Sequence, residues 1–91
     1  MTVSVKIPAS FRPYANDQSE LNLDAPDIST LLGCIRADYP ELAARLCTPD
    51  GAPRSFVNIY VNEDDIRFLS DLETPLSDGD EVLIVPAIAG G

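Results

Sequence analysis

The chain has 91 residues, enough for one small domain, and a domain of this size leaves little room for an enclosed active site. Fifteen Asp and Glu residues against six Lys and Arg residues give a formal net charge of −9, and such a surface repels the phosphates of nucleic acids. The sequence contains no histidine, which excludes catalysis by Ser-His or Cys-His pairs and removes the commonest zinc ligand.

Two short strands are predicted at the N-terminal end. Residues 2–7 alternate between apolar and polar side chains, as in a strand with one buried face, and Pro8 ends this strand. Residues 9–19 contain several turn-forming residues and are predicted to be a loop. Because the loop leads to a second short strand near residues 20–23, the two strands are expected to form a hairpin with a long connection.

One main helix is predicted to follow the hairpin. Asp27 is a suitable N-cap, and apolar residues keep helical spacing over residues 28–39. A shorter helix begins at Pro40 and covers residues 41–46, because proline is favoured in the first turn of a helix. Two prolines and an Asp-Gly pair make residues 48–53 a loop.

Three more strands are predicted in the C-terminal half. Residues 55–62 alternate most clearly, and residues 66–69 follow as a short strand after an acidic turn at 62–65. An Asp-Gly turn at 78–80 precedes the last strand, residues 81–85. The order of elements predicts an α+β fold, a ubiquitin-like β-grasp with a mixed sheet of four to five strands and one main helix packed on one face.

The acidic turns and the two cysteines are interpreted as structural. The carboxylates at 62–65 and 78–81 lack the ligand spacing of a calcium loop, so no metal site is expected. Cys34 falls within the predicted main helix and is expected to be a small core residue, whereas Cys47 at a helix end is the better candidate for an exposed thiol. No disulfide between them is expected in a reducing cytosol.

Targeting signals are not evident in the sequence. No stretch approaches the about 18 apolar residues of a membrane span. Residues 1–6 lack the basic region and apolar core of a signal peptide. We therefore expect a cytoplasmic protein that is a monomer when free and binds neither membranes nor nucleic acid.

The C-terminal residues are the strongest functional feature. Gly90 and Gly91 close a short apolar segment that directly follows the last predicted strand. We predict a β-grasp domain over residues 1–85 and a flexible tail over residues 86–91. A diglycine end without side chains fits a narrow channel, so the Gly91 carboxylate is the candidate reactive group. The alternative interpretation is an incidental frayed end, since chain termini tolerate change.

The same segment carries a resemblance to a known family. Asp78-Gly79-Asp80-Glu81-Val82, followed by Ile84, Pro86 and a terminal Ala89-Gly90-Gly91, resembles the C-terminal signature of the MoaD/ThiS family of sulfur carrier proteins. The run from Phe56 to Asn62, with Asp65 to Phe68, is similar to the actinobacterial CysO-type branch that carries sulfur for cysteine synthesis. Pro86-Ala87-Ile88 in place of two consecutive prolines also favours that branch over the molybdenum-cofactor branch. The resemblance covers essentially residues 1–91.

The resemblance implies a role as a protein cosubstrate rather than a catalyst. In that family, a separate E1-like enzyme uses ATP with Mg to adenylate the terminal carboxylate, here that of Gly91, and a sulfur donor then converts it to a thiocarboxylate. Residues Ala87, Ile88, Ala89 and Gly90 would thread the partner's active site. The chain itself would bind no cofactor. The implied sulfur acceptor is a PLP-dependent cysteine synthase or a synthase of the thiosugar or thiazole type.

A partner-binding surface is predicted from strand alternation. If the apolar residues of the strands at 55–62 and 81–85 pack on the helix, then Phe56, Tyr60, Leu83 and Val85 lie on the opposite face of the sheet. A contiguous exposed apolar patch of this kind marks a binding site. Arg67 is expected to add a charged contact at the rim.

Two other functions remain open at this point. A ubiquitin-like protein modifier would use the same activated Gly91 but pass it to a lysine amine. A β-grasp interaction module would bind its partners without covalent chemistry, and its diglycine end would be incidental.

Overall fold

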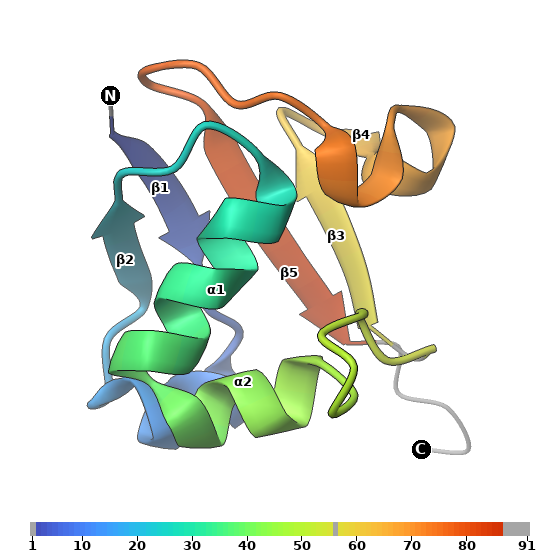
Figure 1. The fold of residues 1–91 in the computed structure, drawn as a ribbon. Coiled ribbons are helices and arrows are strands. Elements are labelled where there is room, and N and C mark those ends of the chain that lie inside the picture. The colour runs from blue at the N-terminus through green and yellow to red at the C-terminus, as the bar shows by residue number, and fades with distance from the viewer. Residues whose placement is uncertain (1, 56, 87–91) are drawn as a thin grey trace.

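A computed structural model describes residues 2–55 and 57–86 of the chain, which form a mixed five-stranded sheet with two helices on one face (Figure 1). The strand order is β2-β1-β5-β3-β4, with β1 and β5 parallel and the other neighbours antiparallel. The strands are β1 (Val3–Lys6), β2 (Glu20–Leu23), β3 (Val57–Val61), β4 (Asp64–Asp65) and β5 (Glu81–Pro86). The helices are α1 (Ile28–Asp38) and α2 (Pro40–Leu46), with short 3-10 helices η1 (Ala9–Ala15), η2 (Ile66–Phe68) and η3 (Asp71–Glu73).

The boundaries of the two helices follow from local sequence. The Asp27 side chain accepts a hydrogen bond of 2.7 Å from the backbone N–H of Thr30, which caps the start of α1. The carboxylate is stabilised by this bond, so the pKa of Asp27 lies below its ordinary value. Tyr39 precedes a proline and leaves the helical conformation, which ends α1 at Asp38, and Pro40 begins α2. Both predicted helices are confirmed.

The core lies between the sheet and the helices. Alternate residues of β1, β3 and β5 face inward, and all of them except Pro86 at the end of β5 are nearly inaccessible to solvent. They pack with the apolar face of α1 and with two leucines of α2. Residues of this core that are almost completely buried include Val3, Val5, Ile28, Leu31, Ile35, Leu42, Leu46, Val82 and Ile84.

Two local predictions are wrong. Residues 9–19 are not simply a loop, because η1 lies within them and buries Phe11 and Ala15 against the core. The predicted strand at 66–69 is instead the 3-10 helix η2, and strand pairing in this region is limited to the two residues of β4. Because a strand places alternate residues on one face and η2 does not, Ile66 is 2% exposed whereas Phe68 is 86% exposed.

The expectation for the two cysteines is also wrong. Cys47, predicted to be the more exposed thiol, is buried, and Cys34 is only half-buried. The loop after α2 folds back over Cys47, and a β-bridge joins Cys47 to Pro53. Burial raises the pKa of the Cys47 thiol, an effect that Arg36 and Arg54 partly oppose. The buried thiol is therefore less reactive than an exposed one.

Several predicted features lie outside the described residues. They are Phe56 and residues 87–91, which include Gly90 and Gly91. The division into a domain over residues 1–85 and a tail over 86–91 stays a prediction, although β5 itself includes Pro86, which pairs with Val57. Within residues 2–55 and 57–86, no helix is long and apolar enough to cross a membrane.

Candidate partner surface beside the C-terminal strand

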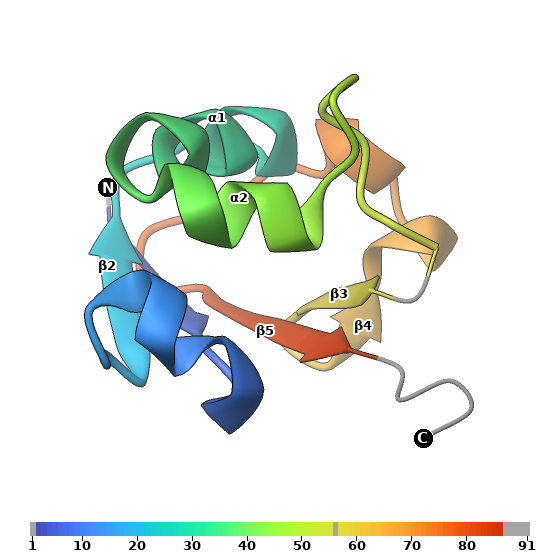
Figure 2. The same ribbon diagram turned by 90° about the horizontal axis from the view of Figure 1, so that it is seen from below.

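The face of the sheet opposite the helices carries three of the predicted surface residues. Figure 2 shows α1 and α2 on the same side of the sheet, with the other side of β5 and β3 not covered by them. Tyr60 of β3 lies directly opposite Leu83 of β5, and Asn58 lies opposite Val85. Residues paired in this way share a face, so Tyr60, Leu83 and Val85 lie together on the open face. Leu83 is 42% exposed, and the other two are half-buried.

Arg67 is held at the border of this surface by a buried carboxylate. Its Nη2 donates to Asp65 Oδ2 at 2.8 Å and its Nε to Asp65 Oδ1 at 3.2 Å, and the backbone N–H of Arg67 also donates to Oδ1, at 2.9 Å. Nη2 further donates to Asn58 Oδ1 at 2.6 Å. Asp65 pairs with Tyr60 across the β3–β4 ladder, so the guanidinium lies beside the open face.

The same contacts set the protonation of the Asp65–Arg67 pair. The hydrogen bonds from the Arg67 side chain and backbone hold the pKa of Asp65 below its ordinary value, and those with Asp65 raise the pKa of Arg67. Asp65 is almost fully buried, whereas the Arg67 side chain is 58% exposed. The pair therefore holds the guanidinium in place through Nε and Nη2, while more than half of the arginine side chain stays accessible to a partner.

The Asp-Gly-Asp segment anchors the start of β5. Gly79 has a φ of +88°, a conformation that favours glycine, and its N–H donates to the carbonyl of Thr2 at 2.8 Å. The Asp78 carboxylate accepts from the backbone N–H of Thr2, at 2.8 Å. Asp80 accepts from Asn62 Nδ2 at 2.9 Å and from the N–H of Ser77 at 2.8 Å. These bonds fix the start of β5, the strand that precedes the C-terminal residues.

Three carboxylates of the acidic turns at 62–65 and 78–81 accept hydrogen bonds from within the protein, namely Asp65, Asp78 and Asp80. Within residues 2–55 and 57–86, no group of three or more Cys, Asp or Glu side chains is arranged to hold a metal ion. Asp65 differs from the expected solvated turn residue, because it is buried against Arg67. The turn at Asn62 and Glu63 has positive φ at both residues, which matches a tight hairpin connection.

The structure thus unites part of the predicted site. Tyr60, Leu83, Val85 and Arg67 come together, while Phe56 and the residues from Ala87 to Gly91 lie outside the described part of the chain. Sequence reasoning missed Asn58 and Asp65, which position Arg67. It also missed the exposure of Phe68 and Leu69, since the strand predicted at 66–69 would have buried alternate residues.

Comparison with known proteins identifies the family. The model of the ThiS family matches residues 5–91. The chain belongs to the ThiS family. The sulfur carrier protein CysO of Mycobacterium tuberculosis is 39% identical over 93 residues, with all of both chains covered. The small archaeal modifier protein 3 of Haloferax volcanii is 32% identical over 94 residues, again over both full lengths.

Solved structures confirm the predicted fold. A chain in the crystal structure of the Amycolatopsis orientalis BexX/CysO complex matches with a TM-score of 0.88 and 30% identity, covering 98% of this chain and 99% of that chain. The crystal structure of Mycobacterium tuberculosis CysO matches with a TM-score of 0.85 and 36% identity, covering 94% and 99% of the two chains. The fold is a ubiquitin-like β-grasp, and the resemblance to sulfur carriers of the CysO type is confirmed.

Proposed function

We propose that this chain is a sulfur carrier whose Gly91 carboxylate is activated and loaded with sulfur by partner enzymes. The observation that carries the proposal is full-length similarity to sulfur carrier proteins, combined with a diglycine end that follows the central strand β5. Beyond Pro86, the five remaining residues span at most about 17 Å when fully extended. That length lets a terminal carboxylate enter a partner's active site while the folded domain stays outside.

The proposed chemistry has two steps. A carboxylate oxygen of Gly91, ionised at neutral pH, attacks the α-phosphorus of ATP in a separate E1-like enzyme, and pyrophosphate leaves. Hydrosulfide then attacks the carbonyl carbon of the acyl-adenylate, so that a C–S bond forms, the bond to AMP breaks and one proton is released. The product is a thiocarboxylate at Gly91. Both ATP and Mg belong to the activating enzyme, and the chain is its cosubstrate.

The sulfur acceptor is proposed to be a biosynthetic enzyme of the same cell. A PLP-dependent cysteine synthase, or a synthase of the thiosugar or thiazole type, would take sulfur from the Gly91 thiocarboxylate. The related CysO in a solved complex with BexX supports recognition of carriers of this kind by partner proteins. We propose a cytoplasmic location, where ATP and these partners are available.

A protein-modifier role is the second candidate. Its support is the full-length similarity to a small archaeal modifier protein, at 32% identity. Activation of Gly91 would be the same, but the acyl group would pass to a lysine amine of a target protein. We favour the sulfur carrier because the identity to CysO is higher.

The test of activation is ATP–pyrophosphate exchange with the adenylating enzyme of the same organism. The full chain should support exchange, whereas a variant lacking Gly90 and Gly91, or one extended beyond Gly91, should not. Thermal unfolding of each variant should match that of the full chain, because the removed or added residues lie beyond β5. Normal exchange by the shortened chain would contradict the proposal.

A further inference from the structure

Charge is distributed unevenly between the two ends of the sheet. Because β2 and β3 run antiparallel to β1 and β5, one end of the sheet holds the last residue of β5, Pro86, together with the starts of β2 and β3. We call this the tail end (Figure 1). The loops at the opposite end hold many of the carboxylates, namely Asp24, Asp27, Glu63, Asp64, Asp78, Asp80 and Glu81.

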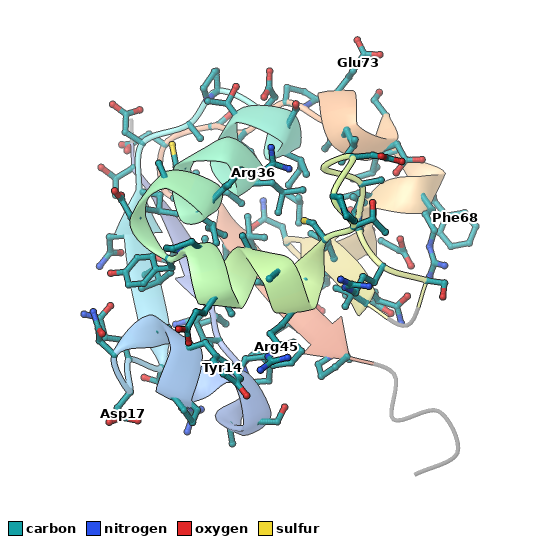
Figure 3. All side chains as sticks on the ribbon, turned by 60° about the horizontal axis from the view of Figure 1, so that its bottom comes forward. Tyr14, Asp17, Arg36, Arg45, Phe68 and Glu73 are labelled. Atoms are coloured by element: carbon teal, nitrogen blue, oxygen red, sulfur yellow. The ribbon has the colours of Figure 1, made fainter. Side chains whose placement is uncertain are left out.

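Three arginines surround the tail end, although the chain as a whole is strongly acidic. Arg12 of η1 and Pro86 line the same open cleft, which has a volume of about 480 Å³. The carbonyl of Arg54 accepts from the N–H of Val57, and Val57 pairs with Pro86, while the Arg54 side chain contacts α2 in a cleft that it shares with Arg36. The Arg45 guanidinium lies 4.4 Å from the centre of the Tyr14 ring, between α2 and η1 (Figure 3). We call Arg12, Arg45 and Arg54 the basic collar.

The collar arginines are positioned by neutral groups. Arg12 Nε donates to the carbonyl of Ile7 at 3.1 Å, and Arg54 Nε donates to the carbonyl of Ala44 at 3.1 Å. The ring of Tyr14 positions the Arg45 guanidinium through a cation–π contact. These contacts orient each guanidinium without cancelling its charge. Lys6, which lines the same cleft as Arg12, is instead paired with Glu20 at 2.9 Å.

Two acidic residues of this half of the molecule lie near the collar: Glu20 lines the cleft of Arg12, where it pairs with Lys6, and Glu41 is one turn before Arg45 on α2. Asp17 and Asp38 line another groove along β2, at the edge of the sheet. Asp50 lines a cleft with Arg36 and α1 residues on the helix layer. The three collar arginines therefore give this end of the sheet more positive charge than the opposite end, where the seven carboxylates named above lie.

We propose that the basic collar docks onto an acidic rim around the entrance of the adenylating enzyme's active-site channel. This inference rests on the proposed function and adds the chemistry of the partner. An acidic rim attracts the collar and repels the carboxylate-rich opposite end, so the field orients the carrier with its C-terminus toward the channel. A partner with a basic rim would select the wrong end.

Phosphate groups are not the ligands of the collar in this arrangement. The reacting ATP meets the Gly91 carboxylate, and five extended residues separate Gly91 from Pro86 by up to about 17 Å. Arg12 shares a cleft with Pro86, and Arg54 adjoins the partner strand of Pro86, so the collar stays at the channel mouth while the carboxylate reaches the nucleotide. Nucleic acid is disfavoured because the formal net charge is −9.

The test compares charge variants of the full chain as substrates of the adenylating enzyme. The triple variant Arg12→Gln, Arg45→Gln, Arg54→Gln should raise the KM for the carrier about 10-fold at 50 mM salt, with kcat unchanged, since rim charges act mainly on association. At 0.5 M salt, where the Debye length is about 4 Å, the difference should shrink to under about 2-fold. Thermal unfolding of each variant verifies that it is folded.

Single variants give matched controls. Arg45→Gln should raise KM and Arg45→Lys should restore it, whereas Arg36→Gln, the same change on α1 in the cleft that also holds Arg54, should have little effect (Figure 3). An unchanged KM for the triple variant, or an increase in KM for Arg36→Gln equal to that for Arg45→Gln, would overturn the proposal that the collar docks on the enzyme. Either result would leave the proposed function intact. Absence of exchange with the unmodified chain would instead defeat the proposed function, and the collar with it.

Discussion

Replacing side chains on the open sheet face by alanine should weaken partner binding. The loss of affinity from burying less apolar surface is limited by the fraction of each side chain that is exposed in the free chain. Leu83 is 42% exposed in the free chain, so a partner can cover at most that fraction of it. Full burial of a leucine contributes about 1.5–3 kcal/mol, so 42% of it corresponds to roughly 0.6–1.3 kcal/mol, or roughly a 3- to 9-fold loss of affinity for Leu83→Ala. Tyr60→Ala should cost more, about 2 kcal/mol or about 30-fold, because truncation of an aromatic anchor removes more than the area that its exposed fraction measures.

Calorimetric titration against the adenylating enzyme measures both losses. Arg36→Ala and Asp38→Ala, on the exposed surface of α1, serve as controls and should bind like the unmodified chain. Thermal unfolding separates loss of binding from loss of fold, because Tyr60 also pairs within the sheet. Unchanged affinity for Leu83→Ala and Tyr60→Ala, together with weakened binding of Arg36→Ala or Asp38→Ala, would place the interface on the helix face and refute the reasoning.

Two further predictions concern the cysteines and the Asp65–Arg67 pair. The double variant Cys34→Ala, Cys47→Ala should still accept sulfur, and loss of thiocarboxylate formation by a folded double variant would show that a cysteine takes part. In the native chain, Cys47 should be alkylated more slowly than Cys34, because Cys47 is buried and burial raises the pKa of its thiol. The pKa of Asp65 is lower in the folded chain than its ordinary value of 3.8, so its stabilising contribution is present above that value and is lost as the pH falls through the folded pKa. Urea unfolding at pH 7 and pH 3 should show a smaller loss of stability for Asp65→Asn than for the unmodified chain, and equal losses would contradict this role.

The elements that sequence reasoning predicted correctly have strong periodic patterns. The strands β1, β3 and β5 alternate apolar and polar residues, and burial of one face fixes their orientation. The helix α1 has both a capping aspartate and a proline after its end. The partner face followed from the same alternation, since Tyr60 and Leu83 had to lie opposite the core.

The features that escaped prediction depend on contacts between distant or irregular segments. The 3-10 helices η1 and η2 lack a periodic pattern, and Ile66 turns inward only because the chain bends after β4. Burial of Cys47 depends on the loop that follows α2, because this loop folds back so that Pro53 forms a β-bridge with Cys47. The clustering of Arg12, Arg45 and Arg54 depends on tertiary packing of η1, α2 and the segment before β3, which sequence spacing does not reveal.

The most direct measurement is the intact mass of the chain after incubation with the adenylating enzyme, ATP, Mg and hydrosulfide. Replacement of one oxygen of the Gly91 carboxylate by sulfur predicts a gain of about 16 Da that requires ATP. Oxidation of Met1, the single methionine, produces nearly the same gain, so fragmentation must place the added mass in the C-terminal peptide. An unchanged C-terminal peptide would contradict the sulfur-carrier account, and attachment of Gly91 to lysines of other proteins would favour the modifier.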